Sequence, residues 1–165
     1  MIQKKICMVG MFATGKTSLV QKFVYSRFSE KYHSTVGVKI DRKQVEVEGT
    51  TVKLLLWDLA GKDEFQDVPA SYLRGSGGLF YVVDGTRRET LEQLYALHAM
   101  AHETVGDVPT IVALNKKDLT DQWLLQRDDY DALSDRGLYT LGTSAKTGEG
   151  VEDAFLWLAA ATIKS

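Results

Sequence analysis

An eight-residue segment near the amino terminus carries the most specific chemistry in the sequence. Residues 10–17 read GMFATGKT and match the pattern G-x-x-x-x-G-K-S/T, in which a glycine-rich turn wraps the oxygen atoms of a phosphate. Lys16 adds a mobile cation to the amides of the turn, and Thr17 offers a hard oxygen of the kind that Mg²⁺ prefers. A plain strand-to-helix turn with an exposed lysine would be the alternative. We expect a site for the phosphates of a nucleotide.

A carboxylate follows the apolar stretch at residues 52–57. Asp58 begins the sequence DLAG, and a carboxylate at the end of a strand can hold the water shell of a metal ion. Gly61 would let a backbone N–H approach a terminal phosphate. Taken alone, this pattern is also typical of an ordinary turn at the end of a strand.

A second polar segment, NKKD at residues 115–118, follows the apolar stretch 109–114. The Asp118 carboxylate can accept hydrogen bonds from two adjacent donors, and guanine offers two at N1 and N2, whereas adenine has an acceptor at N1. Residues 143–146, TSAK, follow the short apolar stretch 138–141 and could close the other side of the base. The pattern predicts guanine recognition.

The elements that would position these segments alternate along the chain. Continuous apolar stretches predict buried strands, and a pair of strands around the Glu48-Gly49-Thr50 turn predicts an antiparallel hairpin. Helical periodicity separates these strands, and the ranges that we expect to be helical are 16–26, 91–101, 121–135 and 151–162. The expected fold is α/β: a P-loop three-layer sandwich with a mostly parallel six-stranded sheet and one antiparallel edge hairpin. Residues 1–165 read as one domain.

Composition excludes several classes of protein. With 20 Lys and Arg against 22 Asp and Glu, and with the basic residues scattered, the chain has no electrostatic footprint for duplex nucleic acid, so we expect no nucleic-acid partner. Cys7 is the one cysteine, which excludes an intrachain disulfide and a cysteine-based zinc site and fits a reducing, cytoplasmic location. No apolar run approaches the roughly 18 residues of a membrane span.

Together these segments resemble the small GTPases of the Ras superfamily, and they are most similar to those of its Rab-like and Ras-like branches. The resemblance covers nearly the whole chain and rests on five segments in order: GMFATGKT, the threonine of YHSTVG, WDLAG, NKKD and TSAK. It implies a switch that binds GTP with Mg²⁺ and hydrolyses it to GDP by attack of water, without a covalent protein intermediate.

The resemblance also assigns roles to individual residues. The residues that would take part in catalysis are Lys16, Thr35, Gly61 and Lys62. The residues that would hold the metal ion are Thr17, Thr35 and Asp58. The residues that would bind the nucleotide are Ala13, Thr14, Gly15, Lys16, Thr17, Ser18, Phe28, Tyr32, Thr35, Gly61, Asn115, Lys116, Asp118, Ser144, Ala145 and Lys146. Within this set, Phe28 would stack on guanine and Tyr32 would cover the phosphates.

Two segments would change with the nucleotide. By the resemblance, residues 27–38 and 60–76 are switch segments that GTP orders and GDP relaxes, and they would face an effector, an exchange factor or a GTPase-activating protein. Family members often end in a cysteine-bearing tail for prenylation, whereas this sequence stops at residues 162–165, TIKS. We therefore expect no lipid anchor in this chain and membrane recruitment only through a partner or an absent tail.

The sequence departs from the family pattern at two positions. Lys62 stands where the family usually has Gln, and an ammonium only donates hydrogen bonds, so the attacking water would be poorly oriented. Phe12 stands where Ras-like members often have Gly and could crowd that water. We expect slow intrinsic hydrolysis, although Lys62 could instead stabilise the transferring phosphoryl group, or both residues could merely tune a working enzyme.

Two alternatives to a hydrolysing switch remain. The first is a scaffold that stays loaded with GTP, which Lys62 and Phe12 favour. The second is a P-loop ATPase or nucleotide kinase, which would need an adenine site and usually a lid or acceptor domain. Asp118 argues against the second, and 165 residues leave little room for it.

Overall fold

The centre of the molecule is a mixed β-sheet. The computed structural model describes residues 2–26, 28, 38–59 and 69–164. Within these ranges six strands lie in the order β2-β3-β1-β4-β5-β6. Their bounds are β1 Ile2–Val9, β2 Val38–Val47, β3 Thr50–Leu59, β4 Gly78–Asp84, β5 Thr110–Asn115 and β6 Tyr139–Gly142. Among the described strands only β2 pairs antiparallel, with β3, so the mostly parallel sheet with an antiparallel edge hairpin is confirmed.

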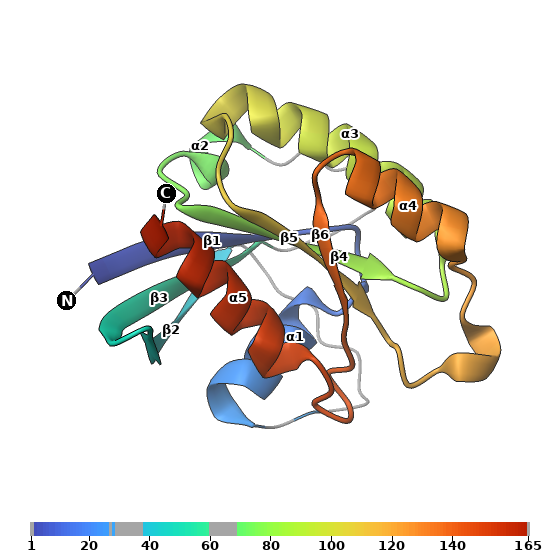
Figure 1. The fold of residues 1–165 in the computed structure, drawn as a ribbon, viewed down its shortest axis with the longest axis horizontal. Helices are drawn as coiled ribbons and strands as arrows, with labels where there is room; N and C mark the ends of the chain where they lie inside the picture. The colour runs from blue at the N-terminus through green and yellow to red at the C-terminus, as the bar shows by residue number, and fades with distance from the viewer. Residues whose placement is uncertain (1, 27, 29–37, 60–68, 165) are drawn as a thin grey trace.

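Helices cover both faces of the sheet and complete the predicted three layers. In Figure 1, α1 and α5 lie on one face, and α2, α3 and α4 lie on the other. The bounds are α1 Lys16–Tyr25, α2 Ala70–Leu73, α3 Arg88–Val105, α4 Arg127–Asp135 and α5 Val151–Lys164, with a short 3₁₀ turn η1 at Thr120–Gln122. No helix in the described ranges combines the length and apolar character that crossing a membrane requires.

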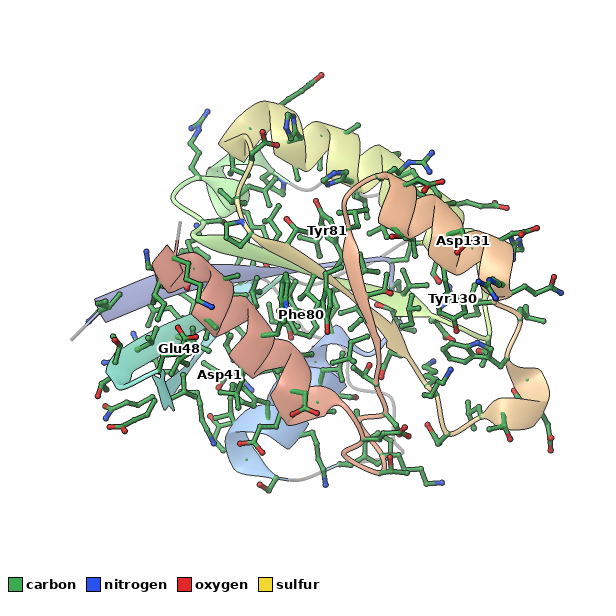
Figure 2. The ribbon with its side chains drawn as sticks, in the orientation of Figure 1. Asp41, Glu48, Phe80, Tyr81, Tyr130 and Asp131 are labelled. Carbon is green, nitrogen blue, oxygen red and sulfur yellow. The ribbon has the colours of Figure 1, made fainter. Side chains whose placement is uncertain are left out.

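The two faces of the sheet bury separate apolar cores. Successive residues of a strand point to opposite faces, and Phe80 and Tyr81 on β4 illustrate this in Figure 2. Phe80 stacks on Phe155 of α5, with ring centroids 4.3 Å apart. Tyr81 packs in the other core, and its hydroxyl lies 2.8 Å from Nδ1 of His98 on α3. Because both faces are covered, the parallel strands read as continuous apolar runs.

The expected helix over 121–135 is wrong in its extent. The structure has the 3₁₀ turn η1 and then a separate α4 that starts only at Arg127. A capping box sets this start, because the Gln126 amide N–H donates to Oδ2 of Asp129 over 2.8 Å. Asp129 is also buried and pairs with Arg88 on α3.

Candidate nucleotide-binding site

The motif segments lie where the parallel strands end. The segment 10–15 follows β1, Asp58 is the penultimate residue of β3, and residues 115–118 and 143–146 follow from β5 and β6. In a parallel sheet these carboxyl ends share one edge, which is where open α/β folds bind ligands. The motif segments predicted from the sequence therefore meet at one edge of the sheet, where side-chain contacts link them.

Two glycines of the phosphate loop, residues 10–15, are required by space and backbone conformation. A Cβ on Gly10 would lie 2.6 Å from the carbonyl oxygen of Val82 on β4. Gly15 has a φ of +107°, and a Cβ there would lie 2.2 Å from Nδ2 of Asn115. Gly15 is also the N-cap of α1 and makes no side-chain cap, so the amides of the first turn suit an anion.

Lys16 folds back onto its own loop. Its Nζ donates to the carbonyl oxygens of Gly10 and Met11 over 2.8 and 3.0 Å, and the side chain is buried. Burial lowers the pKa of the Lys16 ammonium to about 8, and the negative charge of Asp58 offsets part of this effect. The Lys16 ammonium therefore already lies inside the loop that would wrap a phosphate.

Thr17 and Asp58 form an oxygen pair that fits a magnesium ion. The Thr17 hydroxyl donates to Oδ2 of Asp58 over 2.5 Å. Asp58 is 1% exposed, and its Oδ1 has no hydrogen-bond partner among the described residues. Burial raises the pKa of the Asp58 carboxyl, while the Thr17 hydrogen bond and the Lys16 charge act in the opposite direction. A buried, unsatisfied carboxylate oxygen beside a hydroxyl is the donor chemistry that Mg²⁺ and its water ligands match.

Asn115 joins three of the predicted segments. Its Nδ2 donates to the carbonyl oxygen of Thr14 over 3.0 Å, and its Oδ1 accepts from the hydroxyl of Thr143 over 3.0 Å. All three residues are buried. The phosphate loop and the two segments expected around the base are therefore held in a fixed arrangement by one side-chain amide.

Lys116 makes a second link to the phosphate loop. Its Nζ lies 2.7 Å from Oδ2 of the fully buried Asp84 and donates to the carbonyl oxygen of Ala13 over 3.1 Å. Asp84, at the end of β4, also accepts from the amide and hydroxyl of Thr86 over 2.9 and 2.6 Å. The sequence analysis placed Thr143 in the TSAK segment, but it missed Asp84, although Asp84 also ends an apolar stretch.

Asp118 is the residue expected to select the base. It is partly buried, and its Oδ1 accepts a hydrogen bond of 2.8 Å from the hydroxyl of Ser144. The Ser144 oxygen accepts in turn from the amide of Thr147 over 3.1 Å, which fixes the direction in which the hydroxyl donates. Ala145 is buried beside them, and Lys146 is exposed. The structure thus gathers the NKKD and TSAK segments and orients the carboxylate.

The remaining predicted site residues divide into two groups. Ser18 lies in α1 and is partly buried, and Phe28 is 38% exposed. The residues that lie outside the described ranges are Tyr32, Thr35, Gly61 and Lys62. Of the two switch segments, the structure describes only Phe28, Val38 and residues 69–76.

The fold and the motif segments at one edge of the sheet together define an α/β protein of the P-loop class. A sequence model of the Ras family matches residues 5–164. The chain is 37% identical to Ras-related protein Rab-4B of Homo sapiens and of Rattus norvegicus over 156 residues, which are 92% of this chain and 72% of each relative. It is 36% identical to Ras-related protein Rab-4 of Dictyostelium discoideum over 154 residues, which are 92% of this chain and 75% of that relative.

This chain belongs to the Ras family, and its relatives place it in the Rab branch of the Ras superfamily. It is therefore a GTP-binding switch protein of a GTPase family whose members use GTP, GDP and typically Mg²⁺. Effectors, exchange factors and GTPase-activating proteins are the partner classes of that family.

Proposed function

We propose that this chain binds GTP with Mg²⁺, hydrolyses it slowly to GDP, and uses residues 27–38 and 60–76 as a nucleotide-dependent surface for its partners. The observation that carries the proposal is the Asn115 link, which joins the loop bearing Lys16 to the segments bearing Asp118 and Ser144. A cation for phosphate and a carboxylate for guanine thereby belong to one site. We also propose that residues 1–165 form a single GTP-binding domain, since the described helices all pack on one sheet.

The phosphate end would be bound by Lys16, the α1 amides and the loop residues. Ala13, Thr14, Gly15, Thr17 and Ser18 supply amides or hydroxyls there, and Lys16 neutralises charge that develops on the phosphoryl oxygens. Thr17, Thr35 and Asp58 would hold Mg²⁺, which supplies further charge neutralisation when it is bound. Thr35 and Gly61 would respond to the γ-phosphate, and Tyr32 would cover it.

The base would be bound at the opposite end of the site. Asp118 accepts from the two guanine donors, and the hydroxyl of Ser144 keeps the carboxylate in place for this role. Asn115, Lys116, Ala145 and Lys146 frame the pocket, and Phe28 would stack on the base. A carboxylate that is already oriented discriminates strongly, because an adenine would leave it facing an acceptor.

Slow hydrolysis follows from two side chains. Lys62 cannot accept the hydrogen bond that would orient an attacking water, and Phe12 adds a bulky ring to the phosphate loop. A partner that supplies an arginine in trans would raise the rate, by about 10³- to 10⁵-fold as in Ras-family proteins. The proposed enzyme is therefore a weak GTPase on its own and a faster one with a partner.

The end of the second switch segment is anchored to the sheet. The hydroxyl of Tyr72 donates to the carbonyl oxygen of Met8 over 3.1 Å and lies within hydrogen-bonding distance of the Trp57 carbonyl. Lys5 caps this region, since its Nζ donates to the Arg74 carbonyl over 2.7 Å and lies 3.8 Å from the centroid of the Trp57 ring. This supports a switch whose changes are confined to the residues before the anchor.

The test is the identity and fate of the nucleotide that co-purifies with the chain. We expect guanine nucleotide in the wild-type preparation and conversion of added GTP to GDP within hours in the presence of Mg²⁺. Asp118→Asn is the matched variant, because it keeps the size of the side chain and replaces an acceptor with a donor. Adenine nucleotide in the wild type, or equal guanine content in both proteins, would refute the proposal.

A scaffold that remains loaded with GTP is the second candidate, and Lys62 together with Phe12 favours it. It shares the binding site with the first candidate and differs only in the chemical step. Persistent GTP after incubation with Mg²⁺ would establish the scaffold and exclude the enzyme. The same samples, separated by ion-exchange chromatography, answer both questions.

A further inference from the structure

Three consecutive carbonyl groups of the phosphate loop each accept a hydrogen bond from a side chain outside it. Asn115 donates to Thr14, and Lys116 donates to Ala13. The third donor is Arg87, whose Nη1 lies 2.8 Å from the carbonyl oxygen of Phe12. Asn115 and Lys116 belong to the NKKD motif, whereas Arg87 belongs to none of the motifs in the sequence.

The Arg87 contact controls the direction of a backbone donor. In a trans peptide the C=O of one residue and the N–H of the next point in opposite directions. The described chain contains no cis peptide. Holding the Phe12 carbonyl toward Arg87 therefore turns the Ala13 N–H to the opposite side of that peptide plane. Ala13 itself has a φ of +61°, a conformation that L-residues disfavour, so an external tie helps to maintain it.

Arg87 is itself held in place on several sides. Its amide donates to the Asp84 carbonyl over 3.0 Å, and its own carbonyl accepts from the hydroxyl of Thr90 over 2.7 Å. Its Nε pairs with Glu89 at 3.2 Å, and its side chain is 30% exposed. Asp84, which also pairs with Lys116, therefore anchors two of the three donors that reach the phosphate loop.

We propose that Arg87 is a positioning residue for the phosphates of the bound nucleotide, acting through the Phe12 carbonyl on the Ala13 amide. The inference rests on the function proposed above, because it concerns the same phosphate loop. A guanidinium donor to a carbonyl is a charge-assisted hydrogen bond, and its fixed geometry restrains the peptide plane. Arg87 thereby adds to the affinity for nucleotide without touching the base.

The test compares Arg87→Met with Arg127→Met. Methionine retains much of the apolar stem and removes every donor, so packing changes little. Arg127 lies at the start of α4, is 92% exposed, and has an ion pair of 3.9 Å with Asp131. We expect Arg87→Met to accelerate the release of a fluorescent GDP analogue by about tenfold and Arg127→Met to leave it unchanged. Arg87→Lys, which restores a single charged donor, is expected to recover part of the difference and to release GDP about threefold faster than the wild type.

Guanosine separates positioning from a general loss of structure, because it carries no phosphate. The ratio of GDP affinity to guanosine affinity is expected to fall about tenfold in Arg87→Met and to stay constant in Arg127→Met. A defect in overall folding would weaken both ligands together. An Arg87→Met protein with the release rate and affinity ratio of Arg127→Met would overturn the inference.

Failure of the proposed function can be distinguished from failure of the inference about Arg87. If the wild type binds neither GDP nor GTP, the proposed function is wrong, and the loss of binding is not due to Arg87. If Arg87→Met lacks a cooperative melting transition, the comparison moves to Arg87→Lys. The lysine replaces a two-armed donor with a single one, and we expect about threefold faster release of GDP. A wild-type release rate and affinity ratio in Arg87→Lys would then refute the requirement for the guanidinium.

Discussion

The hydroxyl of Thr17 on α1 donates to the carboxylate of Asp58 on β3 over 2.5 Å. This bond joins the start of a helix to the end of a strand at the point where both could face a metal ion. Asp58 is buried, and its second oxygen lacks a hydrogen-bond partner among the residues that the structure describes. The folded chain therefore holds a carboxylate at a cost in stability, which a bound cation would relieve.

Replacing Asp58 by Asn is expected to separate stability from metal binding. The folded-state pKa of Asp58 lies above its usual value of 3.8, so stability falls as the pH rises from about 4 through that raised pKa. In metal-free protein at pH 7, Asp58→Asn should melt at a higher temperature. Its affinity for Mg²⁺ in the GDP complex should fall about 10- to 100-fold, as measured by GDP release during magnesium titration.

Asp41→Asn is the control for that experiment. Asp41 on β2 is also a buried carboxylate that accepts from a hydroxyl, that of Tyr25, but its other oxygen, which makes no hydrogen bond among the described residues, lies 3.7 Å from Nζ of Lys39. Its replacement should leave the magnesium titration unchanged. Equal magnesium dependence in the wild type and Asp58→Asn would contradict the assignment of Asp58 to the metal site.

Lys16 should make both stability and nucleotide affinity depend on pH. Its pKa is about 8 in the folded chain and 10.5 in the ordinary state, so nucleotide-free protein should gain stability as the pH rises from 8 to 10.5. Lys16→Met should lack this gain in urea unfolding across that range. Because phosphate binding favours the ammonium, GDP affinity should fall about tenfold from pH 7 to pH 9 in the wild type. A flat affinity profile in the wild type would show that Lys16 does not pair with phosphate.

Gly15→Ala and Gly49→Ala form a matched pair. Both glycines have positive φ angles, +107° and +80°, but only at Gly15 would the added Cβ meet a neighbour, Nδ2 of Asn115 at 2.2 Å. Gly49→Ala should cost about 1 kcal/mol of unfolding free energy and leave GDP binding intact. Gly15→Ala should cost more in urea unfolding and abolish tight GDP binding. Similar losses in the two variants would indicate that backbone strain alone matters at Gly15.

Lys62→Gln should hydrolyse GTP faster than the wild type in a single turnover. Gln can both donate and accept, which lets it orient a water molecule, and we expect an increase of at least about tenfold. Lys164→Gln, an equivalent change on an exposed residue of α5, should leave the rate unchanged. If the wild type hydrolyses GTP as fast as Lys62→Gln, the hypothesis that Lys62 orients the attacking water poorly is wrong, and charge stabilisation by the lysine is favoured.

Much of the fold could be predicted because local patterns and tertiary structure agree. The stripe of Leu91, Leu94, Leu97 and Ala101 on α3 is buried as its spacing predicts. The bounds of β4 match its apolar run, since both faces of that strand are covered. Strands β1 and β2 are longer than their apolar runs, because pairing with β3 continues through polar residues.

The parts that could not be predicted depend on contacts distant in sequence. The start of α4 at Arg127 depends on the capping box with Asp129, and Asp129 in turn pairs with Arg88, 41 residues away. In the sequence, Arg87 cannot be distinguished from an ordinary surface residue. In the folded chain it follows β4 and donates to the Phe12 carbonyl, 75 residues away. Motifs identify groups that face a ligand, whereas the residues that hold those groups carry no comparable local signal.

The amide of Asn115 has a consequence for how the chain acquires its ligand. It connects Thr14 with Thr143, so the pocket does not exist until β1, β4, β5 and β6 have all paired. Closure of such long chain segments is slow compared with local helix formation. GDP present during refolding should thus trap molecules that are already assembled and leave the rate of assembly unaltered. Nucleotide capture then reports the completion of folding and does not guide it.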